Sequence, residues 1–430
     1  MFRKLLPRSD FYRNIITLMS GTVLSQVIPI LLSPVLSRLY TPEEFGVFSM
    51  FTSIAAAVAV MATFRYELAI MLPEKEESAA SILRLSFIIT LSLTFCLVLL
   101  IALLHNQFPV WFHTPELASF QYFIPLFLLF AGGTQALNYW LSRQKKFKLL
   151  AAGKIGQTGM AGALSILFGY LNFSSLGLVF GAVAGQLTSL LIYAAGSVKK
   201  IAALRQYVTR QHITENFRKY QTFMLVNTPH ALLNVFQDII VIFLINYFFS
   251  KTILGWYAFG YRILKVPTGF VGAAIFQVYF QSASTLKNDR KKLQSLTKKI
   301  YVQLFAVGLP VFAVLAIFAP QIFSLIFGSQ WEEAGRIAQL LSPWLFLNFI
   351  VSPVAAITIV LNRQQWAIWF AVVDTVLRSS AVLIGGMYGS DHLAFILLSI
   401  GSGSLLTYAL YWFYHLPMRV KDVEYGNTES

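Results

Sequence analysis

The positions of lysine and arginine relative to the apolar segments constrain this chain most. Twelve apolar segments, most of them about 20 residues long, can be marked in the sequence, and a helix of that length crosses the hydrocarbon core of a bilayer. They cover residues 15–37, 46–64, 85–104, 119–141, 155–171, 175–195, 222–248, 252–282, 300–327, 337–361, 366–388 and 393–416. Counted from the N-terminus, alternate connections carry 27 of the 33 Lys and Arg residues, whereas the intervening connections carry 3. Because these residues are retained on the cytoplasmic side, we expect a multi-pass membrane protein with both termini in the cytoplasm.

Composition agrees with this topology. The chain is 57% hydrophobic and only 12% charged, which is far too apolar for a soluble domain of this length. In a soluble protein the net charge of +15 would suggest nucleic acid as a partner. Here the cytoplasmic connections account for the charge, since they face anionic lipid headgroups. We therefore expect membrane lipids and no nucleic acid among the partners.

The two halves of the sequence resemble each other. Residues 40–49 match residues 249–258 at an offset of 209, and residues 141–145 match residues 361–365 at an offset of 220. Matches in the same order at similar offsets indicate a duplication of six spans. The predicted fold is an all-α integral membrane protein with twelve transmembrane helices in two six-helix bundles. The bundles would cover residues 1–205 and 222–430, with a cytoplasmic linker at 206–221. An even number of spans makes the repeats parallel, which commonly places a substrate path between them.

The seventh segment carries a polar stripe. Its members recur at steps of three and four, which places them on one face of a helix; they are Asn227, His230, Asn234, Gln237 and Asp238. A seam of interhelical hydrogen bonds would explain part of this pattern. Five polar residues exceed what a seam needs, so we favour a hydrated lumen. The first four would bind substrate there, and Asp238 would couple transport to an ion.

Ionisable side chains deep in a membrane are costly and are candidates for function. Arg262 and Lys265 lie three residues apart in the eighth segment, on one face of the helix. They could instead lie near a membrane surface and reach the interface, but their position about ten residues into the segment favours the lumen. We expect both cations to bind an anionic substrate.

The eleventh segment contains Asp374 and Arg378, spaced four apart with the acid first, which favours a pair along one helix. A self-neutralised structural pair is as plausible as a functional one. The 220-residue offset aligns Asp374 with Lys154 at the start of the fifth segment. We therefore add Lys154 and Arg378 to the substrate-binding candidates and Asp374 to the ion-coupling candidates. Glu67, by contrast, ends the second segment and is expected at the membrane interface.

Sequence motifs for enzymatic chemistry are missing. The sequence contains no GxxxxGK[ST] phosphate loop and no HExxH motif, and its single cysteine, Cys96, cannot form an internal disulfide. Its six histidines are scattered, so no metal site is predicted. The extended connections are basic and cytoplasmic, whereas a membrane polymerase or acyltransferase would need a catalytic loop. We therefore expect neither an enzyme nor a cofactor.

Particular residues carry a family resemblance. The segment from Ser33 to Gly46 and the block Arg65-Tyr-Glu67-Leu-Ala, together with the six-plus-six arrangement of spans, resemble the polysaccharide-export flippases. More narrowly, the chain is similar to the Wzx-type flippases for O-antigen or capsule repeat units. The resemblance covers essentially the whole chain and implies a fold like that of the multidrug and toxin extrusion transporters. It supplies no fixed set of functional residues, so the candidates above rest on their chemistry alone.

The resemblance also implies a function. The substrate would be an oligosaccharide linked to undecaprenyl pyrophosphate, moved from the cytoplasmic to the periplasmic leaflet of the bacterial inner membrane. Alternating access would rock one bundle against the other, driven by an H⁺ or Na⁺ gradient. A polysaccharide polymerase and chain-length proteins are further expected partners. A multidrug exporter and a flippase for lipid II or another lipid-linked precursor are alternatives with the same fold, and a polymerase or acyltransferase is an alternative of another class.

Overall fold

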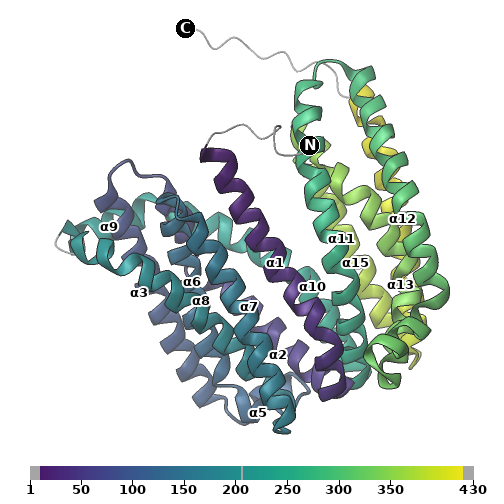
Figure 1. Cartoon of the computed structure of the whole chain (residues 1–430), viewed down its shortest axis with the longest axis horizontal. Helices are drawn as coiled ribbons and strands as arrows, with labels where there is room; N and C mark the ends of the chain where they lie inside the picture. Colours follow the sequence, from purple (N-terminus) through teal and green to yellow (C-terminus); the bar gives the residue numbers. More distant parts are fainter. Residues whose placement is uncertain (1–9, 205–206, 420–430) are drawn as a thin grey trace. The chain divides into compact units, whose positions relative to one another are not determined.

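The computed structural model describes residues 10–204 and 207–419, with the side chains of all these residues except 10–20 and 234. Over these residues the chain forms helices and no strand. It divides into two compact units, Met1–Tyr247 and Phe248–Ser430, and each is described by itself below (Figure 1).

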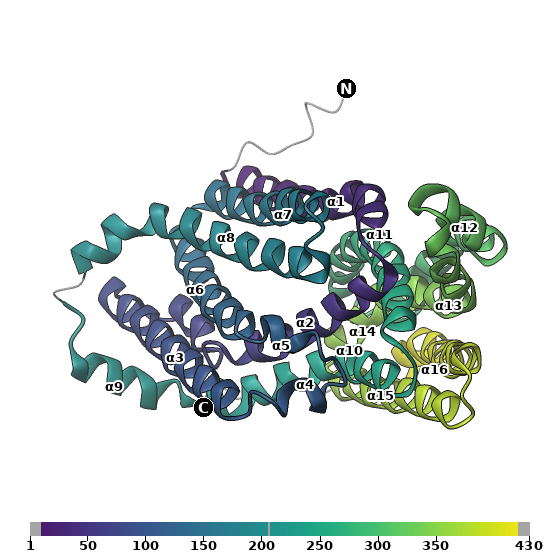
Figure 2. The ribbon, with the colours of Figure 1, turned by 90° about the horizontal axis from the view of Figure 1, so that it is seen from below.

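The first unit contains the helices that precede residue 248. In chain order they are α1 (Asp10–Leu39), α2 (Pro42–Met61), η2 (Tyr66–Met71), α3 (Glu76–Leu103), α4 (Phe108–Trp111), α5 (Leu117–Phe120), α6 (Phe123–Arg143), α7 (Phe147–Tyr170), α8 (Ser174–Leu204), α9 (Arg210–Lys219), η4 (Phe223–Asn227) and α10 (Thr228–Phe248). Helix α8 packs on α6 and α7, α1 packs on α7, and α3 packs on α6 and α9. Figure 2 shows α1, α7 and α8 side by side, with α9 next to α3.

Glycine allows the closest of these contacts. A Cβ atom on Gly181 of α8 would lie 2.6 Å from the carbonyl oxygen of Ala161, and one on Gly185 would lie 2.6 Å from that of Gln157. No larger residue fits at these distances, so the GxxxG spacing of α8 brings its backbone directly onto α7. The hydroxyl group of Tyr40 adds a hydrogen bond of 2.6 Å to the carbonyl oxygen of Ser165.

The start of α2 follows from its sequence. Thr41 is the N-cap, and its backbone N–H donates to Glu44 at 2.7 Å while the Glu44 N–H donates to the Thr41 hydroxyl at 3.3 Å. This reciprocal capping box satisfies two backbone groups that would otherwise have no partner. Pro42 occupies the first turn, where its missing N–H costs nothing. The connection between the first two spans is therefore built from local rules.

The second unit is organised around α13. Its helices are α11 (Lys251–Thr285), α12 (Arg290–Phe327), η5 (Ser329–Trp331), α13 (Glu332–Val351), η6 (Ser352–Ala356), α14 (Ile357–Val360), α15 (Gln364–Met387) and α16 (Asp391–Arg419). Helix α13 packs against α11, α12 and α16, and α15 packs against α16. After Val351 the helix narrows into η6, which begins Ser352-Pro353. This break lies against α11 and determines where the candidate site forms.

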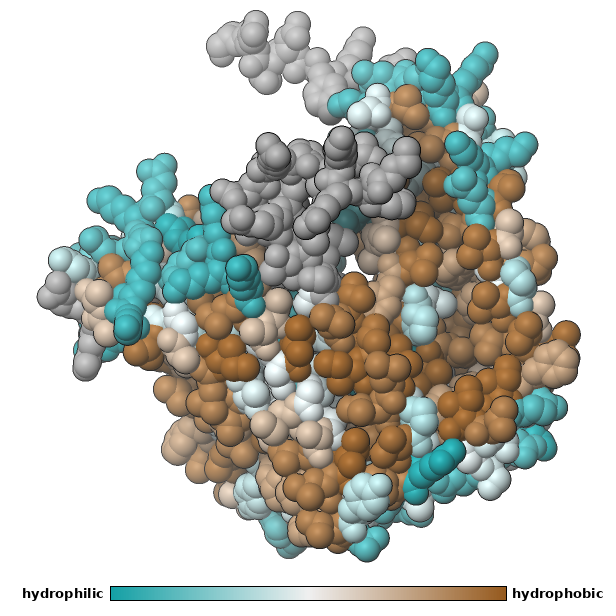
Figure 3. Space-filling model, viewed as in Figure 1, coloured by the Kyte–Doolittle hydropathy of each residue, from teal (hydrophilic) through white to brown (hydrophobic). Residues whose placement is uncertain are grey.

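The predicted membrane character is confirmed. Among the described residues, nine helices are long and apolar enough to cross a bilayer, and a tenth span results if the pair Phe223–Leu233 and Val235–Phe248, bent by 42°, counts as one. Each of the twelve predicted segments falls on helical structure, but α6 and α7 are not among the nine, so the number twelve stays a prediction. Figure 3 shows apolar surface along the middle of each unit and hydrophilic side chains at the ends.

The region around the predicted linker has structure of its own. Within residues 206–221 the chain forms α9, which is held on α3 by a hydrogen bond from the Asn216 amide to the Ser81 hydroxyl. Arg84 of α3 also donates to the carbonyl oxygen of Val208 at 3.3 Å. The first compact unit continues through α10 to Tyr247, whereas the sequence analysis placed residues 222–248 in the C-terminal bundle. That division into bundles stays a prediction.

Candidate functional site

A pocket lies within the second unit, between α11 and the broken end of α13, and its lining combines apolar surface with a few polar side chains. Its volume is about 480 Å³. The lining residues are Lys265, Thr268, Gly269, Gly272, Ala273, Phe276 and Gln277 of α11, with Asn348, Phe349, Ser352 and Pro353 of α13 and η6. The residues from α11 recur at steps of three and one, so together they form one broad side of the helix. Irregular backbone at membrane depth is tolerated where it lines a cavity, and the α13–η6 break does so here.

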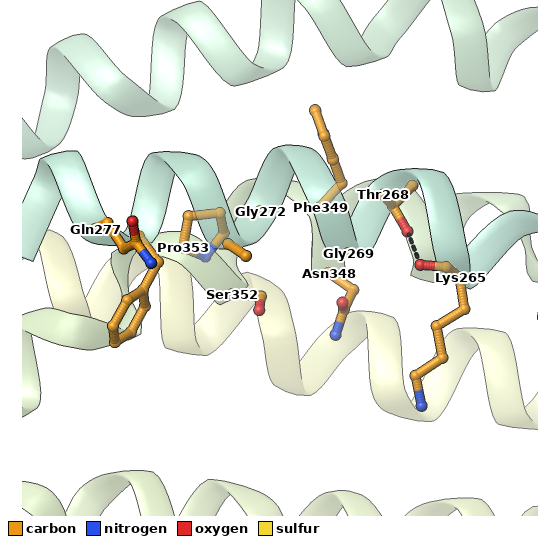
Figure 4. Close-up of a pocket in the computed structure, with 11 residues that line it drawn as sticks. Lys265, Thr268, Gly269, Gly272, Gln277, Asn348, Phe349, Ser352 and Pro353 are labelled. Atoms are coloured by element: carbon orange, nitrogen blue, oxygen red, sulfur yellow. Dashed lines mark hydrogen bonds between the residues drawn. The ribbon is translucent and has the colours of Figure 1, made fainter. Parts of the chain in front are cut away.

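The lining groups are distributed by type along the pocket. Figure 4 shows Lys265 at one end of the pocket and Gln277 at the other, with Asn348 and Ser352 between them. The hydroxyl group of Thr268 is bonded within its own helix, to the carbonyl oxygens of Leu264 at 2.9 Å and Lys265 at 3.0 Å. The lining residues include one cation and no carboxylate. The pocket therefore suits a ligand with an anionic end and a remainder that combines apolar surface with a few hydrogen-bonding groups.

Aromatic rings connect the pocket to a second cation. The Lys265 ammonium lies over the Tyr261 ring, 4.8 Å from its centre. Tyr261 stacks on Trp344 at 5.9 Å with an interplanar angle of 6°. The Arg378 guanidinium lies over the Trp344 ring at 5.2 Å. We call Lys265, Tyr261, Trp344 and Arg378 the cation–aromatic row; it joins α11, α13 and α15.

Asp374 completes the charge balance of this row. Its carboxylate lies 3.8 Å from Arg378, and the two side chains are 25% and 5% exposed. Bringing a guanidinium into a low-dielectric interior costs several kcal/mol unless other groups compensate it. The Asp374 carboxylate and the Trp344 ring both do so, a buried cation–π contact contributing about 2 kcal/mol. The predicted pairing of Asp374 with Arg378 along α15 is confirmed.

The other predicted residues lie elsewhere in the fold. Arg262 is an exposed side chain of α11 that does not line the pocket. Lys154 lies on α7 in the first unit, and its ammonium donates to the Thr22 hydroxyl at 3.0 Å. Asn227 is in η4, and His230, Gln237 and Asp238 are in α10, all within the first unit. The side chain of Asn234 lies outside the described residues. The structure therefore brings together Lys265, Arg378 and Asp374 of the predicted set.

The described part of the chain contains no cluster of metal-ligating side chains. No group of three or more His, Cys, Asp or Glu side chains is close enough there to hold an ion.

The sequence analysis did not identify Tyr261, Trp344, Gln277 or Asn348. Gln277 could have been found, because it is a polar residue within the same apolar segment as Lys265. Trp344 gave no such signal, since its importance depends on Tyr261 of α11 and Arg378 of α15, which meet its ring only in the folded chain. A tryptophan in an apolar segment is ordinary without that information.

A buried carboxyl group in the first unit was also missed. Glu67 of η2 is 1% exposed, accepts a hydrogen bond from the Thr63 hydroxyl and lies 3.5 Å from the Arg65 guanidinium. Burial raises the pKa of the Glu67 carboxyl, against the opposing effects of Thr63 and Arg65. Just before it, Phe64 and Arg65 adopt positive φ angles of 45° and 62°, which are unusual for residues other than glycine. The sequence analysis expected Glu67 at the interface and gave no sign of this turn.

Comparison with known proteins agrees with this architecture. The chain is 21% identical to the succinoglycan biosynthesis transport protein ExoT of Rhizobium meliloti (strain 1021), over 85% of this chain and 72% of that protein. A multidrug resistance MATE family transporter in an inward-facing conformation matches with a TM-score of 0.70 at 16% identity, covering 93% of this chain and 94% of that one. The lipid II flippase MurJ also matches at 0.70, with 13% identity and coverage of 95% and 94%.

The two structural matches confirm the expected all-α fold of the multidrug and toxin extrusion type. Residues 35–336 match the family described as "Polysaccharide biosynthesis protein". This match covers well over half of the chain, and it confirms the resemblance carried by the Ser33–Gly46 segment and the Arg65-Tyr-Glu67 block. The chain therefore belongs to the polysaccharide biosynthesis protein family.

Proposed function

We propose that this protein is a flippase that moves an oligosaccharide repeat unit, linked to undecaprenyl pyrophosphate, from the cytoplasmic to the periplasmic leaflet of the bacterial inner membrane. The observation that carries the proposal is the pocket of the second unit, which places Lys265 beside neutral hydrogen-bonding groups among membrane-spanning helices. A pyrophosphate cannot cross hydrocarbon without compensating charge. Lys265 would supply this charge, and the amide groups of Gln277 and Asn348 would form hydrogen bonds with the sugars.

The charge of the pocket lining supports this function over multidrug export. Cationic drugs need carboxylates in the binding site, whereas the lining residues here include Lys265 and no Asp or Glu. The transport role in the name of the relative ExoT also supports an exporter of polysaccharide precursors. Lipid II and other lipid-linked precursors would use the same charge arrangement, so only the substrate distinguishes these alternatives. The absence of catalytic and phosphate-loop motifs in the sequence supports transport without nucleotide hydrolysis.

Ion coupling and alternating access complete the proposal. Asp374, which contacts Arg378 at 3.8 Å, and Asp238 are the candidates for binding H⁺ or Na⁺. Arg262, Lys154 and the polar residues of η4 and α10 remain proposed substrate contacts. An ion that binds to one of these carboxylates would neutralise it and make the net charge near the substrate's phosphates more positive. The two alternating-access states would then bind substrate with different affinity, and ion binding can shift the protein from one state to the other. A polymerase and chain-length proteins would receive the product in the periplasm.

The test uses the purified protein in liposomes loaded with the lipid-linked oligosaccharide from the source bacterium. We expect sugar to become accessible in the opposite leaflet without ATP, at a rate that depends on an imposed H⁺ or Na⁺ gradient. Ethidium serves as the multidrug control and should not be transported. Ethidium transport without flipping, or a strict requirement for ATP, would contradict the proposed function.

A further inference from the structure

The pocket on α11 is longer than the binding of a pyrophosphate by Lys265 requires. Lys265 and Gln277 lie twelve residues apart on one helix, which corresponds to roughly 18 Å along its axis. Lys265 is a single cation, and it would bind a pyrophosphate at one end of the pocket. The remaining length, from Gly269 to Gln277, is lined by groups without formal charge. Its chemistry must therefore match another part of the ligand.

The chemistry beyond Lys265 suits a sugar. Gln277 and Asn348 each carry an amide group that both donates and accepts, and Ser352 carries a hydroxyl group. All three side chains are exposed at the pocket. Phe276 contributes apolar ring surface, against which the C–H faces of a pyranose can pack. A polyprenyl chain would leave the amides without partners, which costs free energy.

Gly269 and Gly272 both line the pocket but have different surroundings. A Cβ atom on Gly272 would be 3.8 Å from the Pro353 ring, an ordinary contact distance. A Cβ atom on Gly269 would meet no atom within 4 Å. Because Gly269 lines the pocket, a side chain there extends into its open volume without displacing protein atoms. This position controls how much space remains beside Lys265.

We propose that this pocket is the binding subsite for the sugars next to the pyrophosphate, and that Gly269 determines how large a glycan the subsite admits. The inference rests on the proposed flippase function and adds a location and a size filter to it. Sugars would extend from Lys265 along the α11 face toward Gln277. Asn348 and Ser352 would bind their hydroxyl groups from α13 and η6.

The experiment compares Gly269→Ala, Gly269→Phe and the control Val271→Phe. Val271 is on the same helix, is 42% exposed and does not line the pocket. The probes are the complete lipid-linked oligosaccharide of the source bacterium, its one-sugar precursor, and undecaprenyl pyrophosphate without sugar. We expect Gly269→Phe to lower kcat/KM for the complete substrate at least about tenfold, mainly through KM. Flipping of the one-sugar lipid and binding of undecaprenyl pyrophosphate should stay within about twofold.

The remaining variants calibrate this result. Gly269→Ala should transport like the unmodified protein, since alanine favours a helix more than glycine does and adds little volume. Val271→Phe should also transport normally. If Gly269→Phe flips the complete substrate as well as the unmodified protein does, the sugar subsite is wrong while the flippase function stands. If the unmodified protein flips none of the lipids, the function itself is wrong.

A second measurement does not require a bulky variant to fold. Because Cys96 is the only cysteine in the sequence, Gly269→Cys in a Cys96→Ser background labels a single site. Sugar-bearing lipid should slow maleimide labelling of this cysteine at least about fivefold, whereas undecaprenyl pyrophosphate alone should change the rate less than about twofold. Equal protection by both lipids would overturn the assignment of this position to the sugars.

Discussion

The guanidinium group of Arg378 lies over the indole ring of Trp344, 5.2 Å from the ring centre, and the Arg378 side chain is only 5% exposed. Trp344 in turn stacks on Tyr261, whose ring lies beneath the Lys265 ammonium. Two cations from α11 and α15 are thus kept apart by two parallel rings. This separation reduces their mutual repulsion, and the Tyr261 ring holds Lys265 at one end of the pocket.

The first prediction concerns Trp344. Trp344→Leu should destabilise the protein by about 2–4 kcal/mol, because it removes buried ring volume and the surface on which Arg378 lies. Transport per folded molecule should also fall, since Lys265 and Tyr261 lose their support. Trp344→Phe retains a ring and should recover part of both properties. Thermal unfolding in detergent and flipping normalised to folded protein measure the two effects.

Trp331 provides the matched control for this loss. It is fully buried in the same unit and packs on Phe259 with ring centres 4.1 Å apart, but it is not part of the cation–aromatic row. Trp331→Leu should therefore lower stability by a similar amount and leave transport per folded molecule unchanged. Equal losses of transport in both variants would mean that Trp344 has only a packing role.

The second prediction separates Lys265 from Arg262. Neutralising Lys265 by Lys265→Gln should raise KM for the lipid-linked substrate about tenfold, because a charge-assisted contact with phosphate is lost. Lys265→Arg should retain most of the activity, and the amount of protein in the membrane should not change. Arg262 lies one turn earlier but does not line the pocket, and Arg262→Ala is expected to reduce export through a separate contact with the substrate. Arg262→Lys should then keep part of the activity, since charge survives without the fork.

The outcome at these two positions identifies the phosphate site. If Lys265→Gln transports normally while Arg262→Ala abolishes export, the pyrophosphate meets α11 at Arg262 and the pocket of the second unit is not the anion site. Normal export by both variants would exclude α11, and Lys154 and Arg378 would be the next positions to test.

The third prediction concerns the Asp374–Arg378 pair. Asp374→Asn and Arg378→Met should each lower the free energy of unfolding by about 1–3 kcal/mol, because each leaves a partly buried charge with less compensation. The double variant should lose less than the sum of the single variants. A double-mutant cycle with a coupling below about 0.5 kcal/mol would show that the 3.8 Å contact has no energetic weight.

Much of the fold follows from the sequence, because periodicity and charge are local properties. The capping box at Thr41 and Glu44, the GxxxG face of α8 and the i, i+4 spacing of Asp374 and Arg378 all act within one helix or between neighbouring helices. Each depends on residues close together in the sequence and is present in the structure.

The pocket could not be predicted in this way. Its walls come from residues 265–277 and 348–353, which are far apart in the chain and meet only because η6 packs on α11. The cation–aromatic row likewise depends on tertiary contacts made by Tyr261 and Trp344. The sequence analysis instead predicted substrate contacts in the polar stripe at residues 227–238, because a stripe within one segment is visible in the sequence and a pocket wall formed by several helices is not.

The fourth prediction is a pH dependence of stability at alkaline pH. Burial, assisted by the Glu44 carboxylate, raises the pKa of Tyr40 from 10.0 to about 12. Because the folded-state value is higher, neutral Tyr40 contributes stability that is fully present below pH 10 and is lost as pH rises toward about 12. Tyr40→Phe should remove this part of the pH dependence. It should also cost about 1 kcal/mol at neutral pH, through loss of the hydrogen bond to Ser165.

Thermal unfolding between pH 8 and pH 12 tests this prediction, with Tyr388→Phe as a control at an exposed tyrosine. The difference in Tm between the unmodified protein and Tyr40→Phe should shrink over this range, whereas Tyr388→Phe should follow the unmodified protein. A constant difference for Tyr40→Phe would rule out Tyr40 as a titrating contributor.

The fifth prediction is the topology. Alternate connections hold 27 Lys and Arg residues against 3 in the others, so both termini and the connections at 196–221 and 284–299 should be cytoplasmic. Reporter fusions after Lys200, after Lys291 and at the C-terminus should all give a cytoplasmic signal. A fusion after His113, in the connection between α4 and α5, should give a periplasmic signal and serves as the matched control. The same set of fusions also tests the parity of the spans, because Lys200 is cytoplasmic only if an odd number of helices crosses the membrane between it and His113. A periplasmic signal at Lys200 would mean that the helices after His113 cross an even number of times, and the twelve-span arrangement would be wrong.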